Sequence, residues 1–579
     1  MQRFIYERMK EVTSFSSQNE SYSPMFSSIG LGAEPGESGV GKMWLHYNRA
    51  TRTLFNKLVS FPFEFNPKLS AVYRLVYGDD KARLSFWKND GFLLEIETGE
   101  SVRLFPEISD ETASLWVSKC DGEYLLLRGY SKNKDSRDPD ERVPFVIGVR
   151  AVTGKVSADG EMIAKPFGGK ILLAFNIEIL KASESSVRHA LSICPETTQE
   201  AAVLCRRWLR NYSRDFAIEL DDDRVARLTA KAVNGLLFNA TRAQGKLESN
   251  ISPFPSRGGY PATFLWDTYF QNLGYSLLGS DLHREFLRQI AKGMRFDGKL
   301  PQFMCSTWDR PHDTQPALLG WAVKNAMGDS FDLAWEMLPI LEANNEWWLS
   351  SRMTDKGLVF CPSGLETGQD DSPRFDGGAT LACDMNSYLL DQLRVTAELE
   401  AMLGLEDKAK KWSEKADILS ENIMKYLYCK KDNIFYDVSL ETGGFVKIVT
   451  PASFLPLWAG IELEKKQKDK LLRKYLLNKK CMMGDVPFPS VAYNDPRYEH
   501  DKWWRGPTWI SIAWLMLETL DRLGLYNERQ DAADKLWKMI VKDGKMHALF
   551  DSQTGEGLGN EQQGWTCGIF LRLLAERQK

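Results

Sequence analysis

Residues 382–403 read ACDMNSYLLDQLRVTAELEAML, and apolar side chains recur in this run every three or four positions. Such spacing places the apolar side chains on one face of an α-helix. Similar runs follow from about Thr197 onward, at 200–212, 224–242, 264–278, 282–294, 315–327, 331–352, 406–426, 451–459, 468–477, 508–523, 527–541 and 565–577. Counted from Arg224 they make about twelve helices, the number that closes a ring of six helical hairpins. The sequence therefore predicts an all-α (α/α)6 barrel over residues 224–579, preceded by a helical linker over residues 196–223.

Residues 1–195 show a different pattern. Short runs of strand character, such as 71–77, 124–130 and 170–176, alternate with clusters of Gly, Asp and Pro. Runs of this length bounded by turn residues are typical of antiparallel sheets packed face to face. We therefore expect an N-terminal antiparallel β-sandwich domain with an N-terminal extension.

The composition excludes several classes of protein. Of the 579 residues, 43% are hydrophobic and 26% are charged, and the formal net charge is −4. This balance is that of a folded globular protein, and it gives no electrostatic reason to expect nucleic acid or a membrane as partner. The nine cysteines are an odd number without a C-x-x-C pair, which favours reduced core thiols over disulfides or a zinc site. Reduced thiols favour a cytoplasmic protein, and neither an apolar span nor a signal core is evident. Because no zinc or EF-hand spacing is present, no metal is expected among the candidate site residues.

Tryptophan is frequent, with 18 residues, and several of them lie in loops between the predicted helices, next to Asp, Glu, Arg or Gln. These are Trp266, Trp308, Trp503, Trp504, Trp509 and Trp565. Aromatic rings beside side chains that form paired hydrogen bonds suit a sugar, which needs a surface for its C–H face and partners for its hydroxyls. A single tryptophan often only fills a helical core. Repetition of the pattern at successive loops favours a carbohydrate site.

The segment 364–374, GLETGQDDSPR, carries the carboxylates Glu366, Asp370 and Asp371 close together. Repulsion between adjacent acids raises the pKa of at least one of them, and a carboxyl group that stays protonated at neutral pH can act as a general acid. Two other interpretations are a solvated acidic turn and a calcium loop, although the ligand spacing of an EF-hand is absent. The segment is therefore our candidate for acid catalysis.

Six motifs occur in a recognisable order: FLWD at 264–267, TQP at 314–316, the acidic segment at 366–374, DMNSY at 384–388, WRGPTW at 504–509 and TGEGLG at 554–559. In this order they resemble glycoside hydrolase family 63, which comprises processing α-glucosidases and bacterial glucosylglycerate and mannosylglycerate hydrolases and is similar to the trehalases. The likeness spans about residues 264–570. It implies an inverting α-glycosidase that uses two carboxylic acids, needs no cofactor and acts on a small saccharide or α-glucoside.

The resemblance also implies roles for single residues. The general acid of the family falls on Asp370, with Asp371 as the fallback, and Trp266 and Asp267 match the pair that lines the deepest sugar subsite. Further matches to substrate-binding positions are Gln315, Glu366, Arg374, Trp504, Arg505, Trp509 and Trp565. For Arg505, an ion pair at a helix start is the competing interpretation. We expect the loops of Trp266, Gln315, Asp370, Trp504 and Ala548 to converge on one pocket, closed at its deep side, which would make the enzyme exo-acting.

The sequence departs from the family at the general base. The family has a Glu where this chain has Ala548, and alanine cannot take a proton from water, so the chain is expected to hydrolyse glycosides poorly or not at all. The favoured interpretation is an α-glucosidase in a deliberately base-truncated form, with mannose as the main alternative to glucose. Three alternatives remain open: an inverting glycoside phosphorylase, which needs no base; a carbohydrate-binding protein without activity; and a hydrolase in which Glu556 or Glu561 serves as a displaced base.

Overall fold

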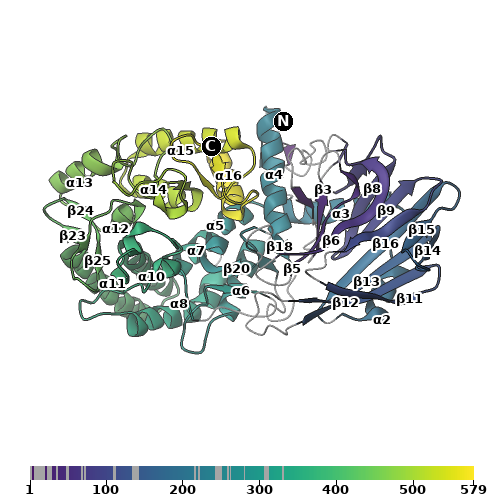
Figure 1. Ribbon diagram of the computed structural model, residues 1–579. Coiled ribbons are helices and arrows are strands. Elements are labelled where there is room, and N and C mark those ends of the chain that lie inside the picture. The colour runs from purple at the N-terminus through teal and green to yellow at the C-terminus, as the bar shows by residue number, and fades with distance from the viewer. Residues whose placement is uncertain are drawn as a thin grey trace.

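The computed structural model describes residues 3–4, 20–22, 29–33, 37–46, 51–66, 69–70, 73–108, 113–132, 142–180, 182–213, 217–218, 222–241, 251–256, 260, 262–279, 281–305, 312–328 and 331–578. Figure 1 shows a part built from strands, coloured purple and blue, beside a part built from helices, coloured teal to yellow. Trp308 lies outside the described residues.

Two antiparallel sheets form the N-terminal part. The first has the order β14 (Lys155–Ser157), β15 (Ile163–Lys165), β10 (Val102–Ile108), β6 (Thr51–Glu64), β5 (Met43–His46), β3 (Ile29–Ala33) and β2 (Glu20–Tyr22), with β4 (Ser38–Val40) also paired to β6. The second has the order β11 (Ala113–Cys120), β12 (Tyr124–Lys132), β13 (Arg142–Thr153), β16 (Lys170–Ile179), β9 (Gly91–Glu97), β8 (Ala82–Lys88) and β7 (Leu75–Tyr77). The rings of Phe105 in β10 and Phe175 in β16 lie 6.4 Å apart, so the two sheets share an apolar core. The expected sheet-rich N-terminal region is confirmed.

Two helices, α2 (Glu184–Ser192) and α3 (Thr198–Ser213), pack on the second sheet. Leu93 and Val146 of that sheet belong to the same buried cluster as Val187 and Leu191 of α2. Strands β9 and β16 are thus buried on both faces, which accounts for their almost continuous apolar sequences. Helix α2 was not predicted, because its short run lies within the region assigned to strands.

The C-terminal part is helical. Its longer helices are α4 (Asp223–Asn239), α5 (Leu265–Tyr275), α6 (Leu282–Lys292), α7 (Leu319–Met327), α8 (Asp332–Ser351), α10 (Cys383–Met402), α11 (Glu406–Tyr426), α14 (Ile510–Arg522), α15 (Tyr526–Asp543) and α16 (Gly564–Arg577). Shorter ones are α9 (Gly364–Thr367), α12 (Leu455–Trp458) and α13 (Lys465–Leu471).

Six of these helices contact one another in a closed circuit. In order they are α5, α7, α10, α12, α14 and α16, and α16 packs back against α5. Every residue of α5 is buried, whereas α11 buries only one stripe, Ala409, Trp412, Ala416, Leu419 and Ile423. A helix that is buried all round lies inside a fold, and a helix with one apolar stripe covers it from outside. Helices α6, α8, α11 and α15 accordingly pack against the circuit, and so does α4, which is buried over most of its length.

Short strands precede several helices of the circuit and place their entry loops together. Strand β20 (Thr263–Phe264) leads into α5, and β27 (Thr508–Trp509) leads into α14. Strand β20 pairs with β21 (Phe303–Met304), and β27 pairs with β28 (Leu549–Phe550). Residues distant in sequence therefore meet at the N-terminal ends of the circuit helices.

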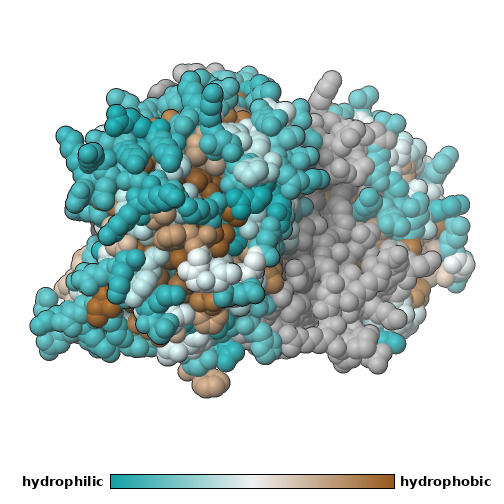
Figure 2. Space-filling model, turned by 60° about the vertical axis from the view of Figure 1, so that its left-hand side comes forward, coloured by the Kyte–Doolittle hydropathy of each residue, from teal (hydrophilic) through white to brown (hydrophobic). Residues whose placement is uncertain are grey.

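The surface and the thiols complete the description. Figure 2 shows hydrophilic residues over most of the visible face of the described helices, with apolar residues in a hollow at its middle. Among the described residues, no helix is long and apolar enough to span a membrane. All nine cysteines are free, and all but Cys120 are buried, as expected for core thiols. Cys120 is exposed because it ends the edge strand β11.

Candidate active site

One cavity opens among the entry loops of the circuit helices. Apolar, aromatic and a few polar side chains line it, as is typical of pockets that bind small molecules. It is lined by Pro255, Tyr260, Phe264, Trp266, Asp267, Gln302, Gln315, Leu365, Gly368, Asp370, Trp503, Trp504, Trp509, Ala548, Gln563 and Trp565. Trp266, Gln315, Asp370, Trp504 and Ala548 all belong to this set, so the predicted convergence of their loops on one pocket is confirmed.

Five indole rings form a wall whose members hold one another. Trp504 and Trp509 stack with ring centroids 3.8 Å apart and an interplanar angle of 4°. Trp503 meets Trp509 edge-on at 4.9 Å, and the Trp509 Nε1–H donates to the Trp503 carbonyl at 3.0 Å. The Trp266 ring lies 5.9 Å from that of Trp504 and 6.1 Å from that of Trp565. Because the rings hold one another in place, a ligand that stacks on them would lose little entropy in ordering the wall.

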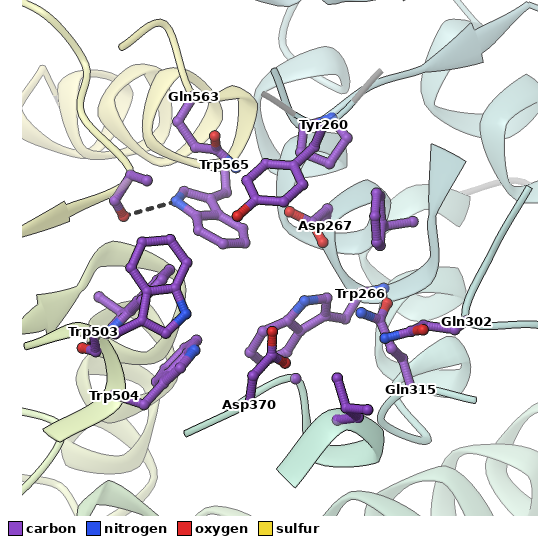
Figure 3. A pocket seen from close by; sticks show the side chains of 16 residues that line it. Tyr260, Trp266, Asp267, Gln302, Gln315, Asp370, Trp503, Trp504, Gln563 and Trp565 are labelled. Atoms are coloured by element: carbon purple, nitrogen blue, oxygen red, sulfur yellow. Dashed lines mark hydrogen bonds between the residues drawn. The ribbon is translucent and has the colours of Figure 1, made fainter. Parts of the chain in front are cut away.

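Two carboxylates reach the cavity from different loops. Asp267 lies in the first turn of α5 and is buried, and Asp370 follows the single turn α9. Figure 3 shows Asp370 beside the Trp266 ring and Asp267 near Tyr260, and both residues line the cavity. Burial, with a smaller contribution from the negative charge of Asp370, raises the pKa of Asp267 to about 8. A protonated Asp267 can donate a hydrogen bond as well as accept one.

Amide side chains add polar groups to the wall. Gln315 Oε1 accepts the backbone N–H of Trp266 at 3.3 Å, which fixes the start of α5 to the loop before α7. Gln302 Oε1 and Gln563 Oε1 are buried and have no hydrogen-bond partner within the described part of the chain. Buried acceptors normally find a donor, so these two lining residues are notable for their unpaired oxygens. Sequence reasoning missed both residues, and it missed Tyr260. An aromatic or amide side chain next to a Trp motif, as at Gln563 near Trp565, was the available signal.

Ala548, at the position expected for the general base, is one of the residues that line the cavity. Ala548 precedes β28, its carbonyl accepts the Trp565 Nε1–H at 3.0 Å, and its N–H donates to the Asn560 carbonyl at 3.0 Å. Its backbone is therefore fixed, and its methyl group faces the cavity. Of the backup acids, Glu556 is exposed, and Glu561 accepts from Lys545 Nζ at 2.8 Å. Neither lines the cavity.

Two predicted sugar contacts are buried in ion pairs outside the cavity lining. Glu366 is buried, and its two oxygens accept from Arg352 at 2.7 and 3.2 Å. Arg374 is also buried and lies 2.6 Å from an Asp384 oxygen and 3.3 Å from an Asp437 oxygen. Through these pairs both side chains attach the acidic segment to neighbouring parts of the fold.

Arg505 and Asp371 likewise do not line the cavity. Arg505 pairs with both oxygens of Asp376 at 2.6 and 3.2 Å and lies 3.9 Å from Asp371. This geometry matches the ion-pair interpretation of Arg505. Asp371 Oδ1 accepts the backbone N–H of Trp504 at 2.9 Å, which ties the acidic segment to the tryptophan loop.

Known proteins share this arrangement of the chain. Residues 260–566 match the family model described as the mannosylglycerate hydrolase MGH1-like glycoside hydrolase domain. Mannosylglycerate hydrolase MGH1 of Selaginella moellendorffii is 23% identical over 412 residues, which cover 55% of this chain and 81% of that protein. Glucosylglycerate hydrolase of Mycolicibacterium hassiacum is 29% identical over 128 residues, 22% of this chain and 28% of that protein. The crystal structure of GH63 mannosylglycerate hydrolase from Thermus thermophilus in complex with glucose has a similar fold, with a TM-score of 0.53 and 21% identity over 60% of this chain and 99% of that one.

Proposed function

Because this chain belongs to the mannosylglycerate hydrolase MGH1-like glycoside hydrolases of family 63, we propose that it is built as an inverting, exo-acting α-glycosidase for a small α-glycoside. The family membership expected from the six motifs is confirmed, and with it the class of enzyme, a glycoside hydrolase. Linkage, stereochemistry and the role of each residue are part of the proposal.

The proposed architecture is an (α/α)6 barrel over residues 224–579, with residues 1–195 as a β-sandwich domain and residues 196–223 as the linker. The closed circuit from α5 to α16 supports it as the inner ring, and the helices outside the circuit would complete the hairpins. In such a ring the entry loops of all inner helices share one end. A site assembled from these loops can then combine residues from the whole length of the barrel.

The observation that carries the proposed reaction is the Asp370 carboxylate, which points into a cavity walled by indole rings (Figure 3). In an inverting mechanism one carboxylic acid protonates the leaving oxygen while a second activates water on the opposite face of the sugar. Asp370 is assigned the first role. Asp267 is assigned to the hydroxyls of the deepest sugar, where the raised pKa lets it donate as well as accept.

Ala548 cannot serve as the general base that activates the water. The protein with alanine at this position is therefore proposed to bind its substrate and to hydrolyse it slowly. A base acts mainly on the attacking water, so its loss removes transition-state help and spares ground-state binding. A phosphorylase is disfavoured, because none of the described lining residues is Lys or Arg. The nearby Lys545 and His547 are paired with Glu561 and Asp543 respectively.

For the substrate we favour an α-glucoside or α-mannoside with a small aglycone of about the size of glycerate. The names of the relatives point to glycosyl-glycerates, and a cavity walled by five indole rings suits a small glycoside. The tryptophan wall supplies a stacking surface for one pyranose, and the amide side chains of Gln302, Gln315 and Gln563 add polar groups to the lining.

The test is Ala548→Glu, assayed with glucosylglycerate, mannosylglycerate and α-linked disaccharides. We expect hydrolysis to rise by about 100-fold or more over the alanine form, and proton NMR to show the β-anomer as the first product. Azide should partly rescue the alanine form by attacking in place of activated water. If Ala548→Glu stays inactive on every α-glycoside while the alanine form turns over with phosphate, the phosphorylase interpretation replaces this one.

A further inference from the structure

One carboxylate oxygen holds the acidic segment on both sides of Asp370. Asp384 Oδ2 accepts the Gln369 Nε2–H at 3.2 Å and the Arg374 Nη2–H at 2.6 Å. Gln369 directly precedes Asp370, and Arg374 follows it by one short turn. The backbone on both sides of Asp370 is thus held by hydrogen bonds to the same atom, Asp384 Oδ2.

The acceptor itself is fixed within the fold. Asp384 lies in the first turn of α10, is fully buried, and its other oxygen, Oδ1, accepts the backbone N–H of Met385 at 2.9 Å. Gln369 and Arg374 are each at least 95% buried. Water therefore does not compete for these bonds, and α10 belongs to the closed circuit.

A second carboxylate makes a useful comparison. Asp437 Oδ2 lies 3.3 Å from Arg374 Nη1, and Asp437 Oδ1 accepts the backbone N–H of Cys383 at 2.8 Å. Asp437 is buried like Asp384 and helps to neutralise the same guanidinium. The Gln369 amide donates to Asp384 instead, so Asp437 supports one side of the segment only.

We propose that Asp384 is the positioning residue for the general acid: through Gln369 and Arg374 it sets where the Asp370 carboxyl stands relative to the leaving oxygen. This inference rests on the proposed role of Asp370. Asp384 does not line the cavity, and it acts through the segment rather than on the substrate.

The chemistry requires a carboxylate at position 384. An asparagine has one acceptor oxygen and one NH2 group. If the asparagine oxygen accepts from Gln369 and Arg374, the asparagine NH2 group faces the Met385 N–H, which is also a donor. In the flipped orientation the NH2 group faces the donors of Gln369 and Arg374 instead. The first orientation keeps both anchors of the segment but unties their acceptor from the Met385 N–H at the start of α10, and the second orientation loses both anchors. In either case the segment can shift, and a displacement of about 1 Å can cost about 100-fold in rate.

The experiment compares Asp384→Asn and Asp437→Asn in the Ala548→Glu background, with Asp370→Asn as the reference. Each is assayed on two aryl α-glucosides, one with an acidic phenol that leaves without protonation and one with a weakly acidic phenol that needs it. For Asp384→Asn we expect kcat to fall about 100-fold on the second substrate and less than about fivefold on the first, with KM little changed. Asp437→Asn should lower kcat on both by the same factor.

A second, milder variant is Gln369→Met. It removes the hydrogen bond from Gln369 to Asp384 and leaves the ion pair between Arg374 and Asp384 in place. We expect the same dependence on the leaving group at about a tenth of the size. Equal losses on both substrates in Asp384→Asn and Gln369→Met would overturn the inference, and so would an Asp437→Asn profile identical to that of Asp384→Asn. If Asp370→Asn itself shows no dependence on the leaving group, the proposed function fails first.

Discussion

Gly368 lies directly against the indole of Trp266. A Cβ built on Gly368 would stand 2.4 Å from ring atom Cζ2 of Trp266, and the backbone of Gly368 has a φ of +74°. Only glycine adopts this conformation without strain and leaves room for the ring. The contact fixes the distance between the tryptophan wall and the segment that carries Asp370.

Gly368→Ala should therefore impair catalysis. The new methyl group must displace either the ring or the segment, and in the Ala548→Glu background we expect kcat/KM to fall by about 100-fold. The matched control is Gly377→Ala, where a Cβ would meet nothing within 4 Å. Unchanged kcat/KM in Gly368→Ala would show that the segment tolerates the displacement.

Asp370→Asn and Asp371→Asn separate the two adjacent acids. With natural substrates in the Ala548→Glu background, Asp370→Asn should lower kcat by about 100- to 10,000-fold, and less when the leaving group needs no proton. Asp371→Asn should have a small effect, because an amide oxygen can still accept the Trp504 N–H. If Asp371→Asn gives the larger and leaving-group-dependent loss, the acid is Asp371.

The pH dependence of stability should reveal Asp267. Burial raises the pKa of this group from the ordinary 3.8 to about 8 in the folded state, so the folded protein holds a proton that the unfolded chain releases. The free energy of unfolding then falls as the pH rises from about 4 to about 8, by about 1.4 kcal/mol for each pKa unit at most. Thermal unfolding of Asp267→Asn should show a stability advantage over the parent that grows across this window and is constant above it. An advantage that does not vary with pH would contradict the raised pKa.

Glu366→Gln tests the buried anchor of the acidic segment. Removing one partner of the paired Glu366 and Arg352 leaves a cation without its counter-charge, and we expect a loss of about 3 kcal/mol in the free energy of unfolding. Asp376→Asn breaks the exposed pair with Arg505 and should cost less than about 1 kcal/mol. Denaturant unfolding of the two variants measures both. Equal losses would mean that burial does not decide the strength of these pairs.

Long amphipathic helices were the most predictable part of the fold. The run predicted at 406–426 coincides with α11, and those at 331–352 and 382–403 differ from α8 and α10 by one residue at each end. The run at 468–477 was less well predicted, because α13 is followed there by a π-helical turn at Leu472–Leu476. A single π-helical turn cannot be recognised from the spacing of apolar residues.

The candidate site, like the fold, was predicted in part. Motif order predicted the convergence of Trp266, Asp370 and Ala548. It did not distinguish side chains that line the cavity from those that form buried ion pairs outside the lining, as Arg374 does. That distinction depends on partners such as Asp437, which lie far along the chain and which no local spacing encodes.

The packing of α16 on α5 bears on how the protein is made. During translation α5 is synthesised before the other helices of the circuit, and α16 is synthesised after them. Until α16 is present, the circuit is open and the apolar side of α5 that contacts α16 is uncovered. Contacts of such long sequence separation form slowly, and exposed apolar surface invites aggregation in the meantime. The chain gains Gln563 and Trp565, and with them a complete cavity lining, only after the other walls have been synthesised.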